Sequence, residues 1–331
     1  MRKDFALCFN DAYTPYACVT IKSIVNHMHR EDDVYVHILS DYISTRHQRY
    51  LQRIVPNGHV LFYTFANNDV FANVPCGWSV YAWYRLFLPQ VLDVNIHRVL
   101  YLDCDVVVND NLDTLFIMDM KDKSIAACLD IESYYSFTYC RLGYDPDLKY
   151  ISSGVLLMNL RKWRENNLCV QMIKFAEEYP QKLRYPDQDS INYVCRDDKI
   201  ILPPQYGVVL NFFREKMFIK EYISEMEQLI EKPLIVHYAG YQPWIYHKDK
   251  CLHSFIWWKI YNSLHAFPQI RFEYANSFIK YWIKVLFIYL GIIKPGTKHY
   301  IFDLYYCRPR IKVEDVIKIV DVVRTEHHET I

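Results

Sequence analysis

Apolar strand-like runs alternate with helical segments over the first 110 residues, and this alternation constrains the fold more than any other feature. Strands are predicted at residues 5–9, 34–39, 60–63 and 98–102. The pattern is typical of an α/β protein with a doubly wound, mostly parallel, Rossmann-like sheet. Ligands of such sheets bind beyond the carboxyl ends of the strands. Two polar strings follow strands in this way, Asn10-Asp11 and Asp103-Cys104-Asp105.

Local signals predict where the first helices begin and end. Thr14 is expected to cap the first helix, with Pro15 at the first helical position. Ser44 is expected to cap a second helix. A third helix is predicted over residues 81–88 and should stop at Pro89, because proline disrupts a helix interior.

The middle of the chain keeps the same alternation. Apolar runs at residues 125–129, 151–159 and 234–236 predict further strands, and the last of these leads directly into His237. Residues 161–179 are predicted to form one amphipathic helix.

The composition excludes some partners and indicates a compartment. Lys plus Arg and Asp plus Glu both number 38, so no excess of positive charge favours a nucleic-acid partner. The ten cysteines form no C-x-x-C pair, and several lie in apolar runs, where cysteine behaves as a small core residue. With no signal-peptide pattern after Met1, we expect reduced thiols and a cytoplasmic location.

The composition changes from residue 265 onward, which divides the chain into a main domain, residues 1–264, and a basic, aromatic helical segment, residues 265–331. Residues 265–312 hold eight Lys or Arg and twelve aromatic residues against two acidic ones. Six apolar residues within this stretch recur at helical spacing: Ile279, Trp282, Ile283, Leu286, Leu290 and Ile293. The run is shorter than the ~20 residues that span a bilayer. Two alternatives stay open, a peripheral helix on the anionic inner face of the membrane and a helix packed on the main domain.

Asp103 and Asp105 are the first candidates for chemistry. Side chains two residues apart in extended chain point to the same side, so both carboxylates can face one ligand. Apolar strand residues flank the pair on both sides, and two such carboxylates repel each other unless a cation or hydrogen bonds compensate. A divalent cation that also binds a diphosphate would compensate them, whereas the alternative is an ordinary pair of turn carboxylates.

His237 is the candidate for a third metal ligand, because it follows a separate apolar strand. Two carboxylates and one imidazole suit Mn²⁺ better than Mg²⁺, which prefers oxygen ligands and remains the alternative.

These residues also resemble a known family. Six strings match glycosyltransferase family 8 in the family's order and cover residues 5 to about 247: Phe9-Asn10-Asp11-Ala12-Tyr13, Tyr84-Arg85-Leu86, Tyr101-Leu102-Asp103-Cys104-Asp105, the stretch from Ser153-Gly154 to Lys162-Trp163, Asp187-Gln188-Asp189 and His237-Tyr238-Ala239-Gly240. The resemblance implies a GT-A fold, a UDP-sugar donor, Mn²⁺ and retaining transfer of a hexose, with galactose and glucose favoured.

The resemblance also implies roles for individual residues. The positions that match the donor site are Asn10, Asp11, Tyr13, Arg85, Asp103, Cys104, Asp105, Ser152, His237, Gly240 and Gln242. Asp103, Asp105 and His237 match the metal ligands, and Tyr13 is placed to stack on uracil. Gln188, Asp187 and Asp130 match catalytic positions near the sugar, while Asp189 is expected to cap the helix that follows.

Two departures from the family pattern concern the donor. Ser152 stands where the family has an asparagine, and Gln242 stands where it has a lysine that neutralises the diphosphate. Lys248 or Lys250 could supply that charge from the following segment, or the metal alone could supply it.

The basic C-terminal segment favours a saccharide or lipid-linked glycan acceptor, as in lipopolysaccharide synthesis. Three alternatives remain open: a glycogenin-like enzyme that glucosylates itself, a non-catalytic protein that binds a nucleotide sugar or a glycan, and a membrane scaffold.

Overall fold

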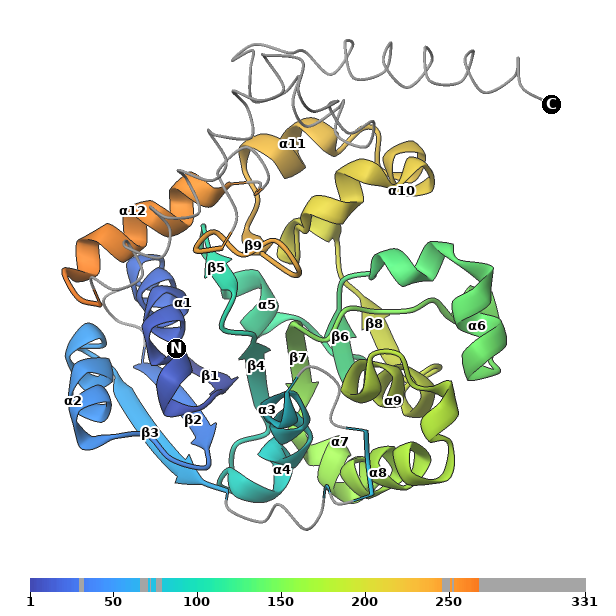
Figure 1. Cartoon of the computed structure of the whole chain (residues 1–331), viewed down its shortest axis with the longest axis horizontal. Helices are drawn as coiled ribbons and strands as arrows, with labels where there is room; N and C mark the ends of the chain where they lie inside the picture. Colours follow the sequence, from blue (N-terminus) through green and yellow to red (C-terminus); the bar gives the residue numbers. More distant parts are fainter. Residues whose placement is uncertain are drawn as a thin grey trace, which may run out of the picture.

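The computed structural model describes residues 1–29, 33–65, 71, 73–75, 79–245, 251 and 253–267. These residues build a seven-stranded sheet in the order β3-β2-β1-β4-β7-β6-β8 (Figure 1). The strands are β1 Arg2–Cys8, β2 Asp33–Ser40, β3 His59–Thr64, β4 Arg98–Leu102, β6 Ile125–Ala127, β7 Val155–Asn159 and β8 Lys199–Ile201. Neighbours are parallel except around β7, which is antiparallel to both β4 and β6. The predicted α/β fold with a mostly parallel sheet is confirmed.

Helices cover both faces of the sheet, as a doubly wound fold requires. Successive strand residues point to opposite faces, so Phe5 and Leu7 pack in one core and Ala6 and Cys8 in the other. The first core is completed by α1 Thr14–Asn26, α2 Thr45–Ile54 and α12 Ser254–Leu264. The second is completed by α3 Val80–Tyr84, α4 Leu88–Val91, α7 Leu160–Glu165, α8 Leu168–Glu178 and α9 Pro186–Val194.

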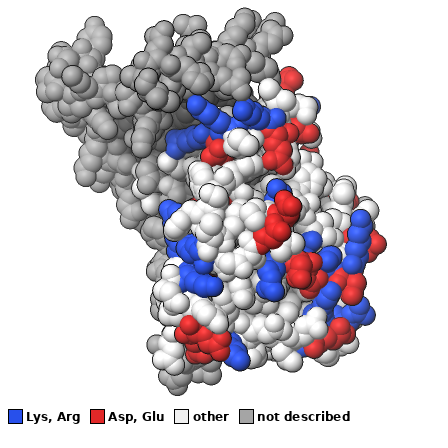
Figure 2. Space-filling view, turned by 90° about the vertical axis from the view of Figure 1, so that its right-hand side faces the viewer, with Lys and Arg blue, Asp and Glu red and all other residues white. Residues whose placement is uncertain are grey.

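A small second sheet lies beyond β4. It consists of β5 Val106–Val108 and β9 Ile235–His237, which run antiparallel. Short helices complete the fold: α5 Asp113–Ile117, α6 Ser136–Leu142, α10 Lys216–Glu221 and α11 Met226–Glu231. Basic and acidic side chains are intermixed on the face of the molecule that Figure 2 shows.

Two predicted helices are divided differently in the structure. The helix expected to stop at Pro89 ends earlier, at Tyr84, and a 3-10 turn follows. Pro89 instead lies in the first turn of α4, where its missing N–H leaves no hydrogen bond unmade. The helix predicted over residues 161–179 is two helices, α7 and α8. The break falls at Asn167, which adopts a left-handed backbone with φ 51°, a conformation that asparagine tolerates better than most residues.

Thr14 does not cap α1 but is its first residue. A 3-10 helix, Asp11–Tyr13, precedes it and places Tyr13 at the cap position. The side chain of Thr14 is consequently buried, and its Oγ1 has no hydrogen-bond partner among the described residues.

Replacing Thr14 with valine should therefore stabilise the protein. Valine has the same shape and removes a buried hydroxyl whose desolvation is uncompensated, so Thr14→Val is expected to raise the free energy of unfolding by about 1 kcal/mol. Urea unfolding monitored by circular dichroism measures this change. A variant that is less stable than the wild type would show that the hydroxyl has a partner in solution.

Two further expectations concern the cysteines and the C-terminus. Seven of the eight described cysteines are buried and Cys140 is exposed, and all eight are free thiols.

None of the helices in the described part of the chain has the length and apolar character needed to cross a bilayer. The predicted helix over residues 279–293 and the rest of residues 268–331 lie outside the described residues, as do Lys248 and Lys250.

Candidate active site

The strand directions bring the candidate residues to one edge of the sheet. β1 and β4 are parallel neighbours, so the residues after them, Asn10 and Asp103, lie at the same edge. β7 runs the other way, which places Gly154, the residue before it, beside the end of β4. The backbone N–H of Asp103 accordingly donates to the carbonyl of Gly154 at 2.9 Å.

Helix α1 and strand β9 hold the Asp-x-Asp loop. The hydroxyl of Thr20 lies 3.0 Å and 2.8 Å from the carbonyl oxygens of Cys104 and Val106. Cys104 is buried. Pairing of β5 with β9 sets Val106 opposite His237, and the N–H of Tyr238 donates to the carbonyl of Asp105.

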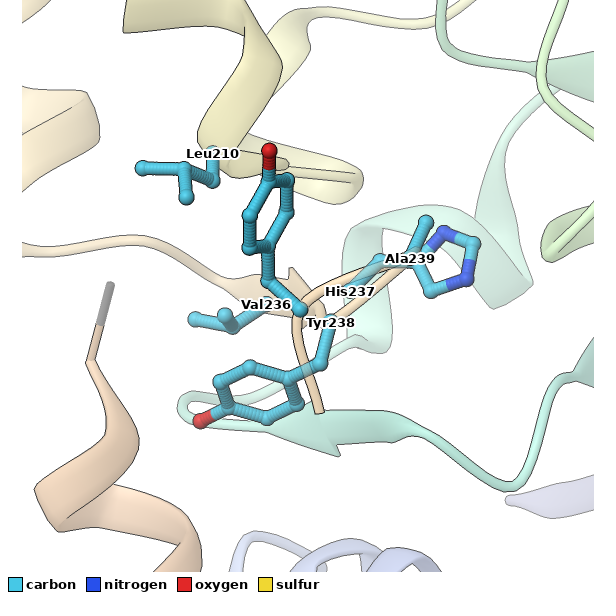
Figure 3. A pocket seen from close by; sticks show the side chains of 6 residues that line it. Leu210, Val236, His237, Tyr238 and Ala239 are labelled. Carbon is cyan, nitrogen blue, oxygen red and sulfur yellow. The ribbon is translucent and has the colours of Figure 1, made fainter. Parts of the chain in front are cut away.

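Asp103, Asp105 and His237 form a tight cluster. One possible ligand atom from each lies within 4.8 Å of the other two. His237 Nε2 is 3.3 Å from Asp105 Oδ1 and 3.7 Å from Asp103 Oδ2. Leu210, Val236 and His237 line a pocket at β9, and the His237 imidazole points away from Leu210 and Val236 (Figure 3). The structure thus brings together the three residues that the sequence analysis proposed as metal ligands.

The charges in the cluster stabilise one another. Burial tends to lower the pKa of His237, but the adjacent Asp105 carboxylate outweighs it, so the pKa lies above its ordinary value. Burial tends to raise the pKa of Asp105, and the neighbouring His237, aided by a hydrogen bond from Gln242, brings it below its ordinary value. A cation bound here would take over the role of a protonated His237 in compensating the carboxylates.

Arg85 selects which oxygen of Asp103 faces the cluster. Its Nη2 donates to Asp103 Oδ1 at 3.0 Å, and the hydroxyl of Tyr101 donates to the same oxygen at 2.6 Å. Asp103 Oδ2 is therefore the oxygen directed toward His237. Because one oxygen is anchored and the other faces the imidazole, the three side chains fit a divalent cation with two carboxylates and one imidazole as ligands.

The rest of the Arg85 guanidinium is bound by protein groups. Nη1 donates to the carbonyl of Ser153 at 2.7 Å and reaches its hydroxyl at 3.1 Å, and Nε donates to the carbonyl of Ala82 at 2.7 Å. Nε also lies 3.4 Å from Asp187 Oδ2. Arg85 thus ties Asp103 to Ser153 and Asp187, and only 4% of its surface is exposed. Its contact with the donor stays a prediction.

The three catalytic candidates lie together next to this arginine. Asp187 and Gln188 are in the first turn of α9, and Gln188 Nε2 donates to Asp130 Oδ2 at 3.3 Å. Burial raises the pKa of Asp130. Burial also raises the pKa of Asp187, although the Arg85 charge opposes this effect.

Asp189 is not the helix cap that the sequence predicted. It lies inside α9 with no exposed surface and pairs with Arg141, with oxygen–nitrogen distances of 2.8 Å and 3.0 Å. Tyr185 occupies the cap position, and its N–H and that of Arg184 both donate to Asp189. The carboxylate satisfies donors ahead of the helix, as a cap does, but from one turn further in.

The residues after β1 are held by local hydrogen bonds. The Asn10 side chain accepts the N–H of Tyr13, and Asp11 accepts the N–H of Ser44 at 2.7 Å and contacts His47 Nδ1 at 2.7 Å. Tyr13 is 38% exposed, and its ring meets Trp244 edge-on with centroids 6.4 Å apart. Tyr13 thus offers a partly open aromatic surface beside the cluster.

The remaining donor-site candidates differ in how they are held. Ser152 donates its backbone N–H to the carbonyl of Cys128. Gly240 has a φ of 75°, and no heavy atom lies within 4 Å of the position that a Cβ would take. Gln242 donates to Asp105, so the residue that departs from the family's lysine contacts a metal-ligand candidate.

Sequence reasoning assigned no role to four residues that organise the site: Tyr101, Tyr150, Ser153 and Gly154. The period of two along β4 places Tyr101 on the same side as Asp103, which is a signal that could have been used. Gly154 and Ser153 could not be found in that way, because their proximity to Asp103 follows from the antiparallel direction of β7.

Comparisons with known proteins show which family the chain matches and which fold it shares. Residues 4–248 match the family model for glycosyl transferase family 8. A lipopolysaccharide 1,2-glucosyltransferase of Escherichia coli K12 is 28% identical over 253 residues, which cover 74% of this chain and 70% of that protein. Glycosyltransferase GlyF of Streptococcus pneumoniae is 28% identical over 280 residues, covering 83% of this chain and 65% of that protein.

A solved structure has the same fold. It is that of the galactosyltransferase LgtC in complex with donor and acceptor sugar analogues, and it superposes with a TM-score of 0.70 at 22% identity, covering 82% of this chain and 99% of that one. The match shows that the sheet and its helices form a GT-A fold. Because the family model spans well over half of the sequence, this chain belongs to glycosyltransferase family 8.

Proposed function

We propose that this protein is a retaining hexosyltransferase that moves galactose or glucose from a UDP-sugar to a saccharide acceptor and depends on Mn²⁺, with Mg²⁺ as the alternative. The observation that supports this most strongly is the convergence of Asp103, Asp105 and His237 within 4.8 Å at the carboxyl end of β4. Two carboxylates and one imidazole form a donor set suited to Mn²⁺.

We assign a separate role to each group of residues at the carboxyl end of β4. Asp103, Asp105 and His237 would hold the cation, and a cation held there would supply Lewis-acid stabilisation of negative charge on UDP. Asn10, Asp11, Tyr13, Ser152 and Gly240 surround the nucleotide and sugar. Arg85 and Gln242 keep Asp103 and Asp105 in position through hydrogen bonds to them. No lysine is needed next to the diphosphate if the cation supplies the positive charge.

The residues near the sugar favour direct transfer on the face from which UDP leaves. Gln188 ends in an amide, which is a poor nucleophile, so the covalent intermediate of two-carboxylate enzymes is disfavoured at this position. Asp130 and Asp187 are partly buried, and we assign them to binding and orienting sugar hydroxyls through a transition state with oxocarbenium character.

The acceptor is proposed from the relatives and from the composition. The similar Escherichia coli protein is named a lipopolysaccharide 1,2-glucosyltransferase, which supports a surface glycan or its lipid-linked precursor as acceptor. We propose that residues 1–264 form the catalytic domain and that the basic, aromatic segment, residues 265–331, associates with the inner face of the cytoplasmic membrane. Most of that segment lies outside the described residues.

Release of UDP tests the proposed reaction. With Mn²⁺ and a suitable acceptor, purified protein should release UDP from UDP-galactose or UDP-glucose, and excess EDTA should lower the rate at least about 100-fold because charge on UDP is then uncompensated. NMR of the product should show the anomeric configuration of the donor. An inverted product would overturn the retaining mechanism. Hexose added to the protein itself would indicate self-glucosylation, and UDP binding without turnover would indicate a binding protein.

A further inference from the structure

The side-chain amide of Gln188 uses its whole hydrogen-bonding capacity inside the protein. Its Oε1 accepts the backbone N–H of Ser153 at 2.9 Å and lies 3.2 Å from the Ser153 hydroxyl. Its Nε2 donates to Asp130 Oδ2 at 3.3 Å and to the hydroxyl oxygen of Tyr150 at 3.2 Å. An amide has two donor hydrogens and one acceptor oxygen with two lone pairs, and each is matched here.

The Tyr150 hydroxyl can form a hydrogen bond only with the NH₂ group of the Gln188 amide. The Tyr150 hydroxyl lies 2.8 Å from Asp189 Oδ1, and Asp189 already pairs with Arg141 and accepts two backbone N–H groups. Such a carboxylate only accepts hydrogen bonds, so the Tyr150 hydrogen is committed to it. The Tyr150 oxygen is left with lone pairs, and a carbonyl oxygen facing it would be repelled.

The backbone N–H and the hydroxyl of Ser153 can form hydrogen bonds only with the carbonyl group of the Gln188 amide. A backbone N–H can donate but cannot accept. Arg85 Nη1 reaches the Ser153 hydroxyl oxygen at 3.1 Å, so the hydroxyl hydrogen is available for Gln188. The two sides of the network therefore require the same orientation of the amide, and a flipped amide would oppose donors to donors.

We propose that Tyr150 and Ser153 are positioning residues that hold the Gln188 amide in one orientation, with its carbonyl toward Ser153 and its NH₂ toward Asp130. The inference rests on the proposed function. A chain of directed hydrogen bonds from Arg85 through Ser153, Gln188 and Tyr150 to Asp189 keeps that site in its reactive arrangement.

This network also fixes Asp130. One carboxylate oxygen of Asp130 accepts the N–H of Glu132 at 2.9 Å and the other accepts from Gln188. Loss of the Tyr150 hydroxyl would leave Gln188 free to rotate and would release one of these two constraints. The expected consequence lies in the reaction step, because Tyr150 has no contact with Asp103, Asp105 or His237 among its hydrogen bonds.

A pair of tyrosine substitutions tests the proposal. Tyr150→Phe should lower kcat about tenfold, the effect of one polar hydrogen bond on the barrier, and should leave the KM for the UDP-sugar within about twofold. Tyr139→Phe is the matched control. Tyr139 is buried in the same cluster, and its hydroxyl bonds to the carbonyl and the hydroxyl of Ser133 and not to Gln188 or Asp130, so its loss should leave kcat unchanged.

Ser153→Ala provides a second variant at the other end of the amide. It should also lower kcat and change the KM for the UDP-sugar much less. Equal kcat values for Tyr150→Phe and Tyr139→Phe, or a loss that falls on KM and UDP affinity, would overturn the positioning role. A wild-type protein that binds and turns over no UDP-sugar would overturn the proposed function, and the inference with it.

Discussion

Gly154→Ala is expected to lower Mn²⁺-dependent UDP affinity at least about 100-fold, because small displacements of a preorganised site have effects of this size. A Cβ at this position would lie 2.2 Å from His237 Cε1 and 2.7 Å from Asp103 Oδ2. Neither atom belongs to a flexible chain end, since Asp103 is anchored by Arg85 and Tyr101 and His237 by β9. The alanine methyl group therefore has to separate two of the three metal-ligand candidates. Calorimetric titration with UDP at saturating Mn²⁺ measures the loss.

Gly58→Ala is the matched control for this substitution. A Cβ at Gly58 would lie 2.6 Å from the carbonyl oxygen of Val34 and 2.8 Å from Val55 Cγ1, in the part of the fold where α2 leads into β3. This variant should therefore lose stability through overpacking while its UDP affinity stays unchanged. Wild-type affinity in Gly154→Ala, or an equal loss in Gly58→Ala, would contradict the role of Gly154 in the cluster.

Asp105→Asn is expected to lower the rate of UDP release at least about 100-fold. The amide keeps the shape of the side chain but removes the charge that holds His237 and a cation, and even partners of metal ligands commonly change metal affinity 10–100-fold. The measurement is UDP release across a Mn²⁺ titration, where a weaker metal site should shift the activation midpoint to higher concentrations.

Asp110→Asn serves as the control for Asp105→Asn. Asp110 is exposed five residues further along, and its carboxylate accepts the N–H of Asn111. The Asp110→Asn substitution removes the same charge from the same part of the chain and leaves Asp103, Asp105 and His237 unchanged. The turnover of this variant should therefore equal that of the wild type. Equal activity of both variants would show that Asp105 is a turn residue and no metal ligand.

Much of the candidate site could be predicted because it depends on local pattern. An apolar strand followed by Asp103 and Asp105 places two carboxylates at a strand end whatever the rest of the chain does. His237 was found for the same reason, since a short apolar run precedes it. The meeting of these residues then follows from a parallel arrangement of strands, which the alternation with helices predicts.

The parts that were missed depend on contacts between segments far apart in the sequence. The protein partners of Arg85 could not be predicted, because the direction of its guanidinium is decided by Ser153, Asp103 and Asp187, which three other segments supply. Asp189 was taken for a helix cap because aspartate commonly occurs there. Its real partner, Arg141, lies on α6, and nothing within α9 indicates that pair.

The central claim is that the Asp103–Asp105–His237 cluster binds UDP through a divalent cation, and calorimetry of UDP binding to the wild-type protein with and without Mn²⁺ tests it most directly. We predict clear binding with Mn²⁺ and a loss of at least about 100-fold after EDTA treatment, because the cation compensates both the carboxylates and the diphosphate. UDP binding of equal strength in both conditions, or no binding in either, would contradict the account.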